Sequence, residues 1–390
     1  MKVSFVTWIN LAFASVFLFL NAAQVSAQCC TGYAYSQEIT ISNPNSSILT
    51  NFQVEFLLNT QALVTAGKMR TDGNDIYVVD ANCNPLSFWI EDNSFNSDKT
   101  NFWVKVPTVA ASGNTSVYLV YGKPSASSPN PTRNGDQTFV FFDDFNTGTV
   151  PNTSKWTFVN NTGSGSPSIS SSGYFTFTAN PSPNLEVGLT HPMTAGNYEI
   201  GAKVFVLNQP GRVDGDPGIG WFPNTISRTH VVAGWSNDDE GPLDAVWANG
   251  GSIGFPVSNP TQNRWSFVRL RLLGNQTQAR HFGHAPLPAF DASSGVLTAT
   301  SSAITKVFVG AFAYQGNPVR YDFFFVRNAT SNEPTVTPQA EIPGPPMACS
   351  AVAPVPTLSQ WGLILLALFI LNYAAIVLWR QKQLGVASRA

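Results

Sequence analysis

The stretch Val268-Arg269-Leu270-Arg271-Leu272 alternates apolar and charged side chains with a period of two residues. Such alternation is typical of a β-strand, because successive strand side chains point to opposite faces of a sheet. The same period recurs along the chain, in residues 52–58, 117–121 and 198–206. Clusters of Gly, Asn, Asp and Pro separate these stretches, and no amphipathic helical pattern precedes residue 360. The sequence therefore predicts an all-β fold.

Length and charge narrow the class of protein further. The 390 residues exceed one ordinary domain, and no internal repeat of fixed period is visible, so we expect two β-sandwiches of jelly-roll type. Only 11% of the residues are charged, which argues against a cytosolic enzyme. The formal net charge of -2 provides no basic field for a phosphate backbone, so nucleic acid is excluded as a partner.

The N-terminal residues are typical of a secretory signal peptide. Lys2 precedes an apolar run at 11–20, and Val25-Ser26-Ala27 supplies the small residues that signal peptidase requires. We expect cleavage after Ala27, so that the exported protein begins at Gln28.

The C-terminal residues carry a second apolar run, at 361–379, which is long enough to cross a membrane. As a helix it would measure about 28 Å, close to the thickness of the hydrocarbon core. Arg380, Lys382 and Arg389 follow it. Because basic flanks stay in the cytoplasm, we predict a single transmembrane helix with the body of the protein outside the cytoplasmic membrane.

A short motif stands immediately before this run. Val355-Pro356-Thr357-Leu358, followed by Trp361-Gly362, closely resembles the IPTL-CTERM sorting signal, with Val355 in place of Ile. The resemblance implies that an exosortase-type membrane enzyme of Gram-negative bacteria processes the segment 355–390. Pro356 disfavours helix in the residue before it, so an extended segment would present the motif. The chain would then be a substrate of that enzyme.

The first unit of the body spans 28–135 and ends in the Pro- and Ser-rich stretch 123–131. It resembles the domain of unknown function 2341, which occurs in secreted and surface proteins. The resembling strings follow one another in order at 39–43, 49–54, 69–76, 88–91, 102–107 and 120–124. The resemblance implies a β-sandwich module without an established activity.

The second unit spans 136–330. Two parts of this unit carry a resemblance: its opening residues 141–145 and Lys155-Trp156, and its closing residues 321–327. They resemble a concanavalin A-like jelly roll of the laminin-G or lectin class. That resemblance implies binding of glycans or proteins, or in some members hydrolysis of polysaccharides. Beyond it, periodicity is lost, and we expect 331–354 to be a Pro-rich spacer that holds the body away from the membrane.

Glycan binding requires exposed aromatic faces beside polar groups. Trp221, Trp235 and Trp247 lie near Gly-, Asn- or Asp-rich turns and could line the rim of a binding site, although burial is the alternative for each. Trp265 begins an alternating strand, and we expect it in the core.

Acidic residues and cysteines suggest two further kinds of site. Asp143, Asp144 and Asp322 could hold a structural calcium ion, because the terminal strands of a jelly roll lie side by side. Export favours disulfides over zinc. We expect Cys83 to pair with one of the two adjacent cysteines, and the other of these to reach the spacer; the four candidates are Cys29, Cys30, Cys83 and Cys349.

Catalytic motifs are missing from the sequence. No two Glu residues are separated by four or five positions, as the paired carboxylates of hydrolases on this fold require. The G-x-S-x-G string at 250–254 lacks the strand and helix of a nucleophile elbow. We therefore expect a non-catalytic protein of the cell envelope that recognises an extracellular carbohydrate or a surface partner. A polysaccharide-active hydrolase and a structural surface or matrix protein are the alternatives.

Overall fold

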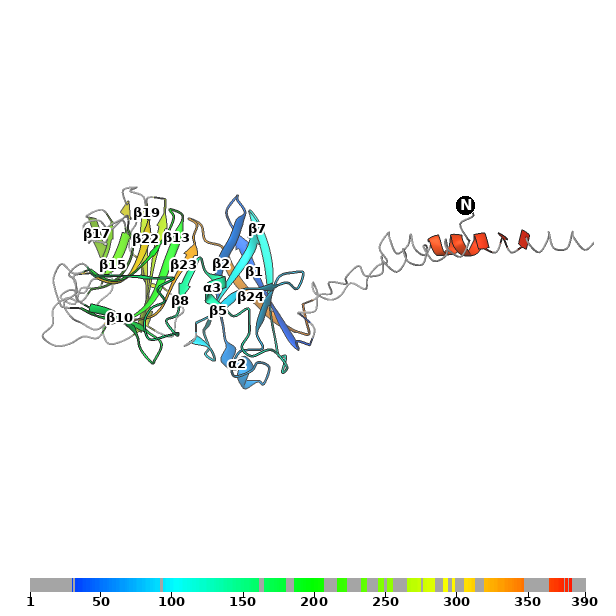
Figure 1. Cartoon of the computed structure of the whole chain (residues 1–390), viewed down its shortest axis with the longest axis horizontal. Coiled ribbons are helices and arrows are strands. Elements are labelled where there is room, and N and C mark those ends of the chain that lie inside the picture. Colours follow the sequence, from blue (N-terminus) through cyan, green and yellow to red (C-terminus); the bar gives the residue numbers. More distant parts are fainter. Residues whose placement is uncertain are drawn as a thin grey trace, which may run out of the picture. The chain divides into compact units, whose positions relative to one another are not determined.

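The computed structural model describes residues 30, 32–91, 94–160, 165–179, 186–206, 216–222, 233–236, 245–248, 251–254, 265–274, 276–284, 290–293, 297–298, 305–312, 319–346, 365–374, 376–377 and 379–380. The described strands form four antiparallel sheets, which we name A to D (Figure 1). The all-β prediction is confirmed.

Sheets A and B form the first module. Sheet A has the strand order β24 (Thr335–Pro343), β1 (Tyr35–Asn43), β7 (Gly113–Tyr121), β3 (Tyr77–Val79) and β4 (Pro85–Leu86). Sheet B has the order β2 (Leu49–Leu58), β6 (Thr100–Val109) and β5 (Phe88–Ile90). The two sheets enclose an apolar core to which alternate residues of each strand contribute, among them Ile39, Val54 and Phe102.

Sheets C and D form the second module. Sheet C has the order β10 (Gly165–Ile169), β11 (Phe175–Ala179), β23 (Val319–Asn328), β13 (Tyr198–Val206), β18 (Trp265–Leu273), β19 (Gln276–His284) and β20 (Phe290–Ser293). In addition, β8 (Phe141–Asp143) pairs with β23, and β21 (Leu297–Thr298) pairs with β19. Sheet D has the order β17 (Gly251–Gly254), β16 (Ala245–Ala248), β15 (Ala233–Ser236), β14 (Asp216–Phe222), β22 (Lys306–Phe312), β12 (Val187–Pro192) and β9 (Thr157–Asn160).

The core of the second module follows the alternation in the sequence. Val268, Leu270 and Leu272 of β18 are buried in it, between sheets C and D. Tyr321 crosses this core from β23: its hydroxyl donates to the carbonyl of Gly310 and accepts from the amide of Gly218 at 3.0 Å. Because β14 and β22 carry these backbone groups, the tyrosine ties the two sheets together.

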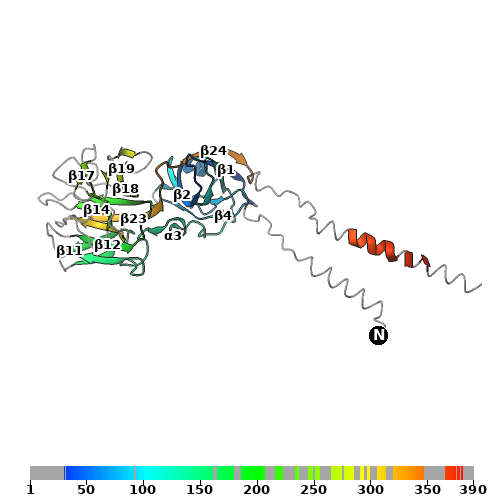
Figure 2. The same cartoon turned by 90° about the horizontal axis from the view of Figure 1, so that it is seen from above.

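Two short helices occur in the first module and its connection to the second. Asn59 caps α2 (Thr60–Thr65), and Asn134 caps α3 (Gly135–Thr138); each side chain accepts a backbone N–H of the first turn. Helix α3 lies between the modules (Figure 2). A Cβ on Gly135 would approach the Phe142 ring to 2.2 Å, so only glycine allows the helix to pack on that ring.

The expected spacer is wrong for 335–343. These residues form β24, which pairs with β1 at the edge of sheet A (Figure 2). Glu341 of β24 accepts a hydrogen bond from the Tyr121 hydroxyl at 2.5 Å and pairs with Lys68 at 2.5 Å. Pro338 and Pro343 fit here because an edge strand leaves one row of backbone groups without a strand partner. The chain thus returns to the first module after completing the second.

We predict that β24 is needed for the stability of the first module. Ending the chain after Pro334 removes the hydrogen bonds to β1, each contributing about 1 kcal/mol, so the free energy of unfolding should fall by roughly 3 kcal/mol or more. Urea unfolding followed by tryptophan fluorescence measures the loss. A chain that ends after Pro346 is the control, and equal stability of the two would contradict the role of β24.

Few residues near the two ends of the chain belong to the part that the structure describes. The predicted signal peptide 1–27 and the motif residues 355–362 lie outside the described residues, as does part of the predicted span 361–379. Within the described part, residues 365–374 are helical, and no described helix is both long and apolar enough to cross a membrane. The transmembrane helix stays a prediction.

Candidate ligand-binding site between the modules

Sheets B and C pack against each other through the faces that point away from their own cores. On sheet B, the register places Glu55, Trp103 and Trp89 in one row across β2, β6 and β5. On sheet C, the even-numbered residues of β18 enter the core of the second module, so Phe267, Arg269 and Arg271 face the first module. Where the two sheets meet, both faces of each sheet are therefore buried.

Aromatic rings fill the middle of this interface. Trp89 of the first module makes edge contacts with Phe142 and Phe323, at ring-centroid distances of 5.0 and 5.1 Å. Trp103 packs 5.2 Å from Phe325. Each of these rings is 5% exposed or less. The rings make the interface a continuous apolar core between the modules.

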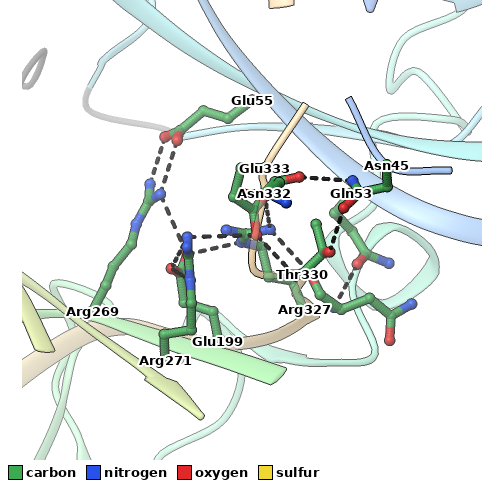
Figure 3. Close-up of polar contacts among 11 residues, drawn as sticks. Asn45, Gln53, Glu55, Glu199, Arg269, Arg271, Arg327, Thr330, Asn332 and Glu333 are labelled. Atoms are coloured by element: carbon green, nitrogen blue, oxygen red, sulfur yellow. Dashed lines mark hydrogen bonds and ion pairs between the residues drawn. The ribbon is translucent and has the colours of Figure 1, made fainter. Parts of the chain in front are cut away.

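An ionic cluster borders these rings, and it consists of Glu55, Glu199, Glu333, Arg269, Arg271 and Arg327 (Figure 3). Arg269 of the second module reaches across the interface and holds Glu55 with two hydrogen bonds, of 2.8 and 2.5 Å. Its guanidinium also lies 4.7 Å from the centre of the Trp103 ring. This paired geometry fixes the orientation of the two modules as well as their contact.

Glu199 is the centre of the ionic cluster. It is fully buried on β13, and its carboxylate accepts from Arg327 Nε at 2.8 Å and from Arg271 Nη2 at 2.9 Å. Burial opposes the charged form, yet the three guanidiniums of the cluster outweigh it and hold the pKa of Glu199 well below its usual range. The carboxylate is ionised at neutral pH.

We predict that Glu199→Gln lowers the free energy of unfolding by about 3–5 kcal/mol, because it leaves buried guanidiniums without their carboxylate. Glu333→Gln is the matched control: that side chain belongs to the same cluster but is 25% exposed, so water can replace it and the loss should be smaller. Urea titrations at pH 7 compare the variants. Equal losses would contradict the central position of Glu199.

A second buried ionic contact joins the modules at Lys203 of β13. Its ammonium lies 3.3 Å from Glu91 of the first module and 2.8 Å from Asp322 of β23. Glu91 is 3% exposed, and its Oε2 has no hydrogen-bond partner among the described residues. Burial therefore raises the pKa of Glu91 to about 7, although the charge of Lys203 opposes this rise.

We predict that Glu91 makes stability fall as pH rises from about 4.5 to 7. Across that window the unfolded chain loses the proton that the folded chain keeps, which amounts to about 3 kcal/mol. Glu91→Gln cannot ionise, so it should exceed the parent in stability at pH 8 and match it near pH 4. In this variant Lys203 still has its ion pair with Asp322. Parallel stability curves for the two proteins between pH 4 and 8 would contradict the assignment.

A polar cleft of about 550 Å³ opens beside this interface. Residues of both modules and of the segment between them line it: Asp72, Asn74, Trp89, Pro129, Asn130, Arg133, Asn134, Gly135, Asp136, Phe142, Asp143, Asp144, Thr147 and Lys155. Carboxylates, amides and two kinds of cation converge here from separate loops. The cleft exists only because the two modules are held together.

Hydrogen bonds fix the wall of the cleft. Lys155 Nζ donates to Asp136 Oδ1 at 2.6 Å and to the carbonyl of Phe142 at 2.9 Å. Asp143 accepts from Trp156 Nε1 at 2.7 Å and from the amide of Phe145 at 2.9 Å. Burial raises the pKa of Asp143, and these two hydrogen bonds oppose the rise. The carboxylate of Asp136 is more than half exposed, so a ligand can reach it beside Lys155.

The predicted calcium residues are brought near one another in the fold but not into one site. As expected, β8 pairs with β23, with Asp143 opposite Phe324. However, Asp322 turns to Lys203 in the interface, whereas Asp143 bonds Trp156 in the core. Asp144 accepts from the amide of Asn146. Among the described residues, no group of three His, Cys, Asp or Glu side chains could hold a metal ion.

The predicted tryptophan rim is wrong at Trp221. This side chain is fully buried in the core of the second module, stacked 5.9 Å from Tyr198. Strands β15 and β16 carry Trp235 and Trp247, whose side chains lie outside the described part of the chain. Trp265, expected in the core, is instead half-buried on the outer face of sheet C. There it lies 5.5 Å from Phe205 and 6.3 Å from Tyr174.

The cysteine prediction is tested only in part. Cys30 and Cys83 are both buried in the first module, at 2% exposure. Cys29 and Cys349 lie outside the described residues. The pairing of the four cysteines stays a prediction.

Family comparisons match two parts of the chain. The profile of a domain of unknown function, DUF2341, matches residues 72–159, and that of the IPTL-CTERM motif matches residues 353–383. Both of these resemblances are confirmed, but the DUF2341 match begins at 72 instead of the expected 28, and it runs past the expected boundary at 135 into β9. Every residue that lines the cleft falls within it. No curated protein matches the chain.

Similar solved structures include a saccharide-bound domain, a lectin and a glycosyl hydrolase family protein. The exoplasmic domain of VIP36, bound to calcium and Man3GlcNAc, is 11% identical over 50% of this chain and 100% of that domain, with a TM-score of 0.36. Lectin II from Ulex europaeus is 10% identical over 48% and 98%, with a TM-score of 0.35. A glycosyl hydrolase family protein from Mycobacterium fortuitum is 12% identical over 48% and 99%, with a TM-score of 0.31. At these scores the similarity assigns no function.

Proposed function

We propose that this chain is an exported, non-catalytic protein of the bacterial cell envelope that binds extracellular carbohydrate in the cleft between its modules. The IPTL-CTERM match at 353–383 supports an exported surface protein that an exosortase-type enzyme processes. The apolar run 361–379 would hold the chain in the cytoplasmic membrane until then.

The cleft is the observation that carries the binding function. Its volume of about 550 Å³ lies within the range of small-molecule sites. Sugars present hydroxyl groups that both donate and accept hydrogen bonds, so a site that offers acceptors and donors side by side suits them. Asp136, Asn134 and Lys155 supply one of each within the same cleft. Trp89 and Phe142 add an apolar floor.

We predict that Asp136→Asn weakens saccharide binding at least tenfold, since a hydrogen bond to a charged group contributes about 1.5 kcal/mol or more. The full chain in mild detergent is first screened on a glycan array, with and without calcium, and the best ligand is titrated by calorimetry. Asp98→Asn, which removes an exposed carboxylate outside the cleft, is the control. A blank array from folded protein would contradict the proposal and favour a structural surface protein.

Polysaccharide hydrolysis is the second candidate, and Asp143 is the residue that favours it. A buried carboxyl with a raised pKa at the wall of a cleft is suited to general acid catalysis. Its two hydrogen bonds to Trp156 and Phe145 favour a structural role instead. Release of reducing ends from the bound glycan, abolished by Asp143→Asn, would establish the enzyme.

A further inference from the structure

A second cluster of aromatic and cationic side chains lies on the outer face of sheet C. It consists of Tyr174, Phe205, Trp265 and Arg320, which we call the Arg320 cluster. Phe205 pairs in register with Trp265 on one side and with Arg320 on the other, and Tyr174 immediately precedes β11. All four side chains are half-buried, whereas Phe267, the next residue on this face of β18, is buried under the first module. The cluster therefore lies on the same face of sheet C as the interface, at a part of that face that solvent reaches.

Arg320 differs from the arginines of the ionic cluster. Its guanidinium lies 5.0 Å from the centre of the Tyr174 ring and 5.2 Å from that of Phe205. No oxygen atom in the described part of the chain accepts a hydrogen bond from it, whereas Arg269, Arg271 and Arg327 each bind a carboxylate. Arginine carries five N–H donors in a planar fork. Arg320 thus keeps its capacity for an external acceptor.

The charges around the cluster leave it positive. Asp322, the nearest carboxylate along β23, is already paired with Lys203 at 2.8 Å, and the same ammonium lies 5.6 Å from the Trp265 ring. One guanidinium charge therefore stands beside three aromatic rings without a described carboxylate to neutralise it.

We propose that the Arg320 cluster is a binding site for a carboxylate-bearing saccharide, such as one uronic acid residue of a polysaccharide chain. The planar fork of Arg320 would hold the carboxylate through two parallel hydrogen bonds. The C–H faces of the sugar ring would pack on Trp265 and Tyr174, whose rings lie 6.3 Å apart. Because Lys203 is paired with Asp322, a single cation without a described carboxylate stands beside the three rings, and it matches one acidic sugar better than an acidic protein surface, which carries several charges. This site goes beyond the cleft and does not depend on it.

The test compares two forms of one polymer. Polygalacturonate carries the carboxylates, and its methyl ester presents the same sugar chain without charge. The full chain in mild detergent should bind polygalacturonate at least tenfold more tightly than the ester, measured by calorimetry. Arg320→Gln should remove that preference, and Trp265→Ala should weaken binding to both polymers. Equal binding of the acid and the ester would overturn the proposal.

Two further variants separate this site from the cleft and from a loss of folding. Arg133→Gln removes a cation of the cleft and should leave the preference for polygalacturonate unchanged; loss of the preference in this variant alone would place the acidic sugar in the cleft and overturn the proposal. Arg320→Lys keeps the charge but not the fork, so it should fold and still bind several-fold more weakly. If both Arg320→Lys and Arg320→Gln fold and bind polygalacturonate as tightly as the parent protein, the proposal is also overturned.

Discussion

The contact of Glu199 with buried arginines is the constraint on which the rest of the structure depends. Sheet C cannot present three guanidiniums toward sheet B unless carboxylates meet them there, because an unpaired buried charge is costly. Glu199 supplies one partner from within the sheet, whereas Glu55 comes from the first module and Glu333 from the segment that leads to β24. Pairing these charges therefore requires both modules and the returning chain.

The pairing of these buried charges also determines where the polar cleft lies. The cleft takes its walls from loops of the first module, from α3 and from the residues around β8, which meet only because sheets B and C are packed. The DUF2341 match covers the same residues, 72–159, and crosses from one module into the next. The unit that the family profile describes is thus closer to the junction of the modules than to either sandwich alone.

Two buried carboxyls of the interface respond oppositely to their surroundings. Glu199 is surrounded by guanidiniums and stays ionised, whereas Glu91 meets a single ammonium that Asp322 shares, and its second oxygen has no described partner. Burial therefore has the larger effect on the pKa of Glu91, whereas the neighbouring charges together have the larger effect on the pKa of Glu199. Acid therefore weakens the contact of Glu199, whereas the contact of Glu91 loses stability as the pH rises from about 4.5 to 7.

The sequence by itself determined the strands, the two-module order, the two family resemblances and, where apolar and charged residues alternate, the side of a strand that faces its own core. A period of two residues is a local property, so Val268, Leu270 and Leu272 were predictable as buried. Only the tertiary structure decided what covers the other side. Arg269 and Arg271 have the pattern of a solvated face, and Trp221 that of an exposed rim, yet the arginines lie beneath a second sheet and the tryptophan lies in a core. Partners such as Glu55, more than two hundred residues away, carry no local signal, and the same is true of the pairing of β24 with β1.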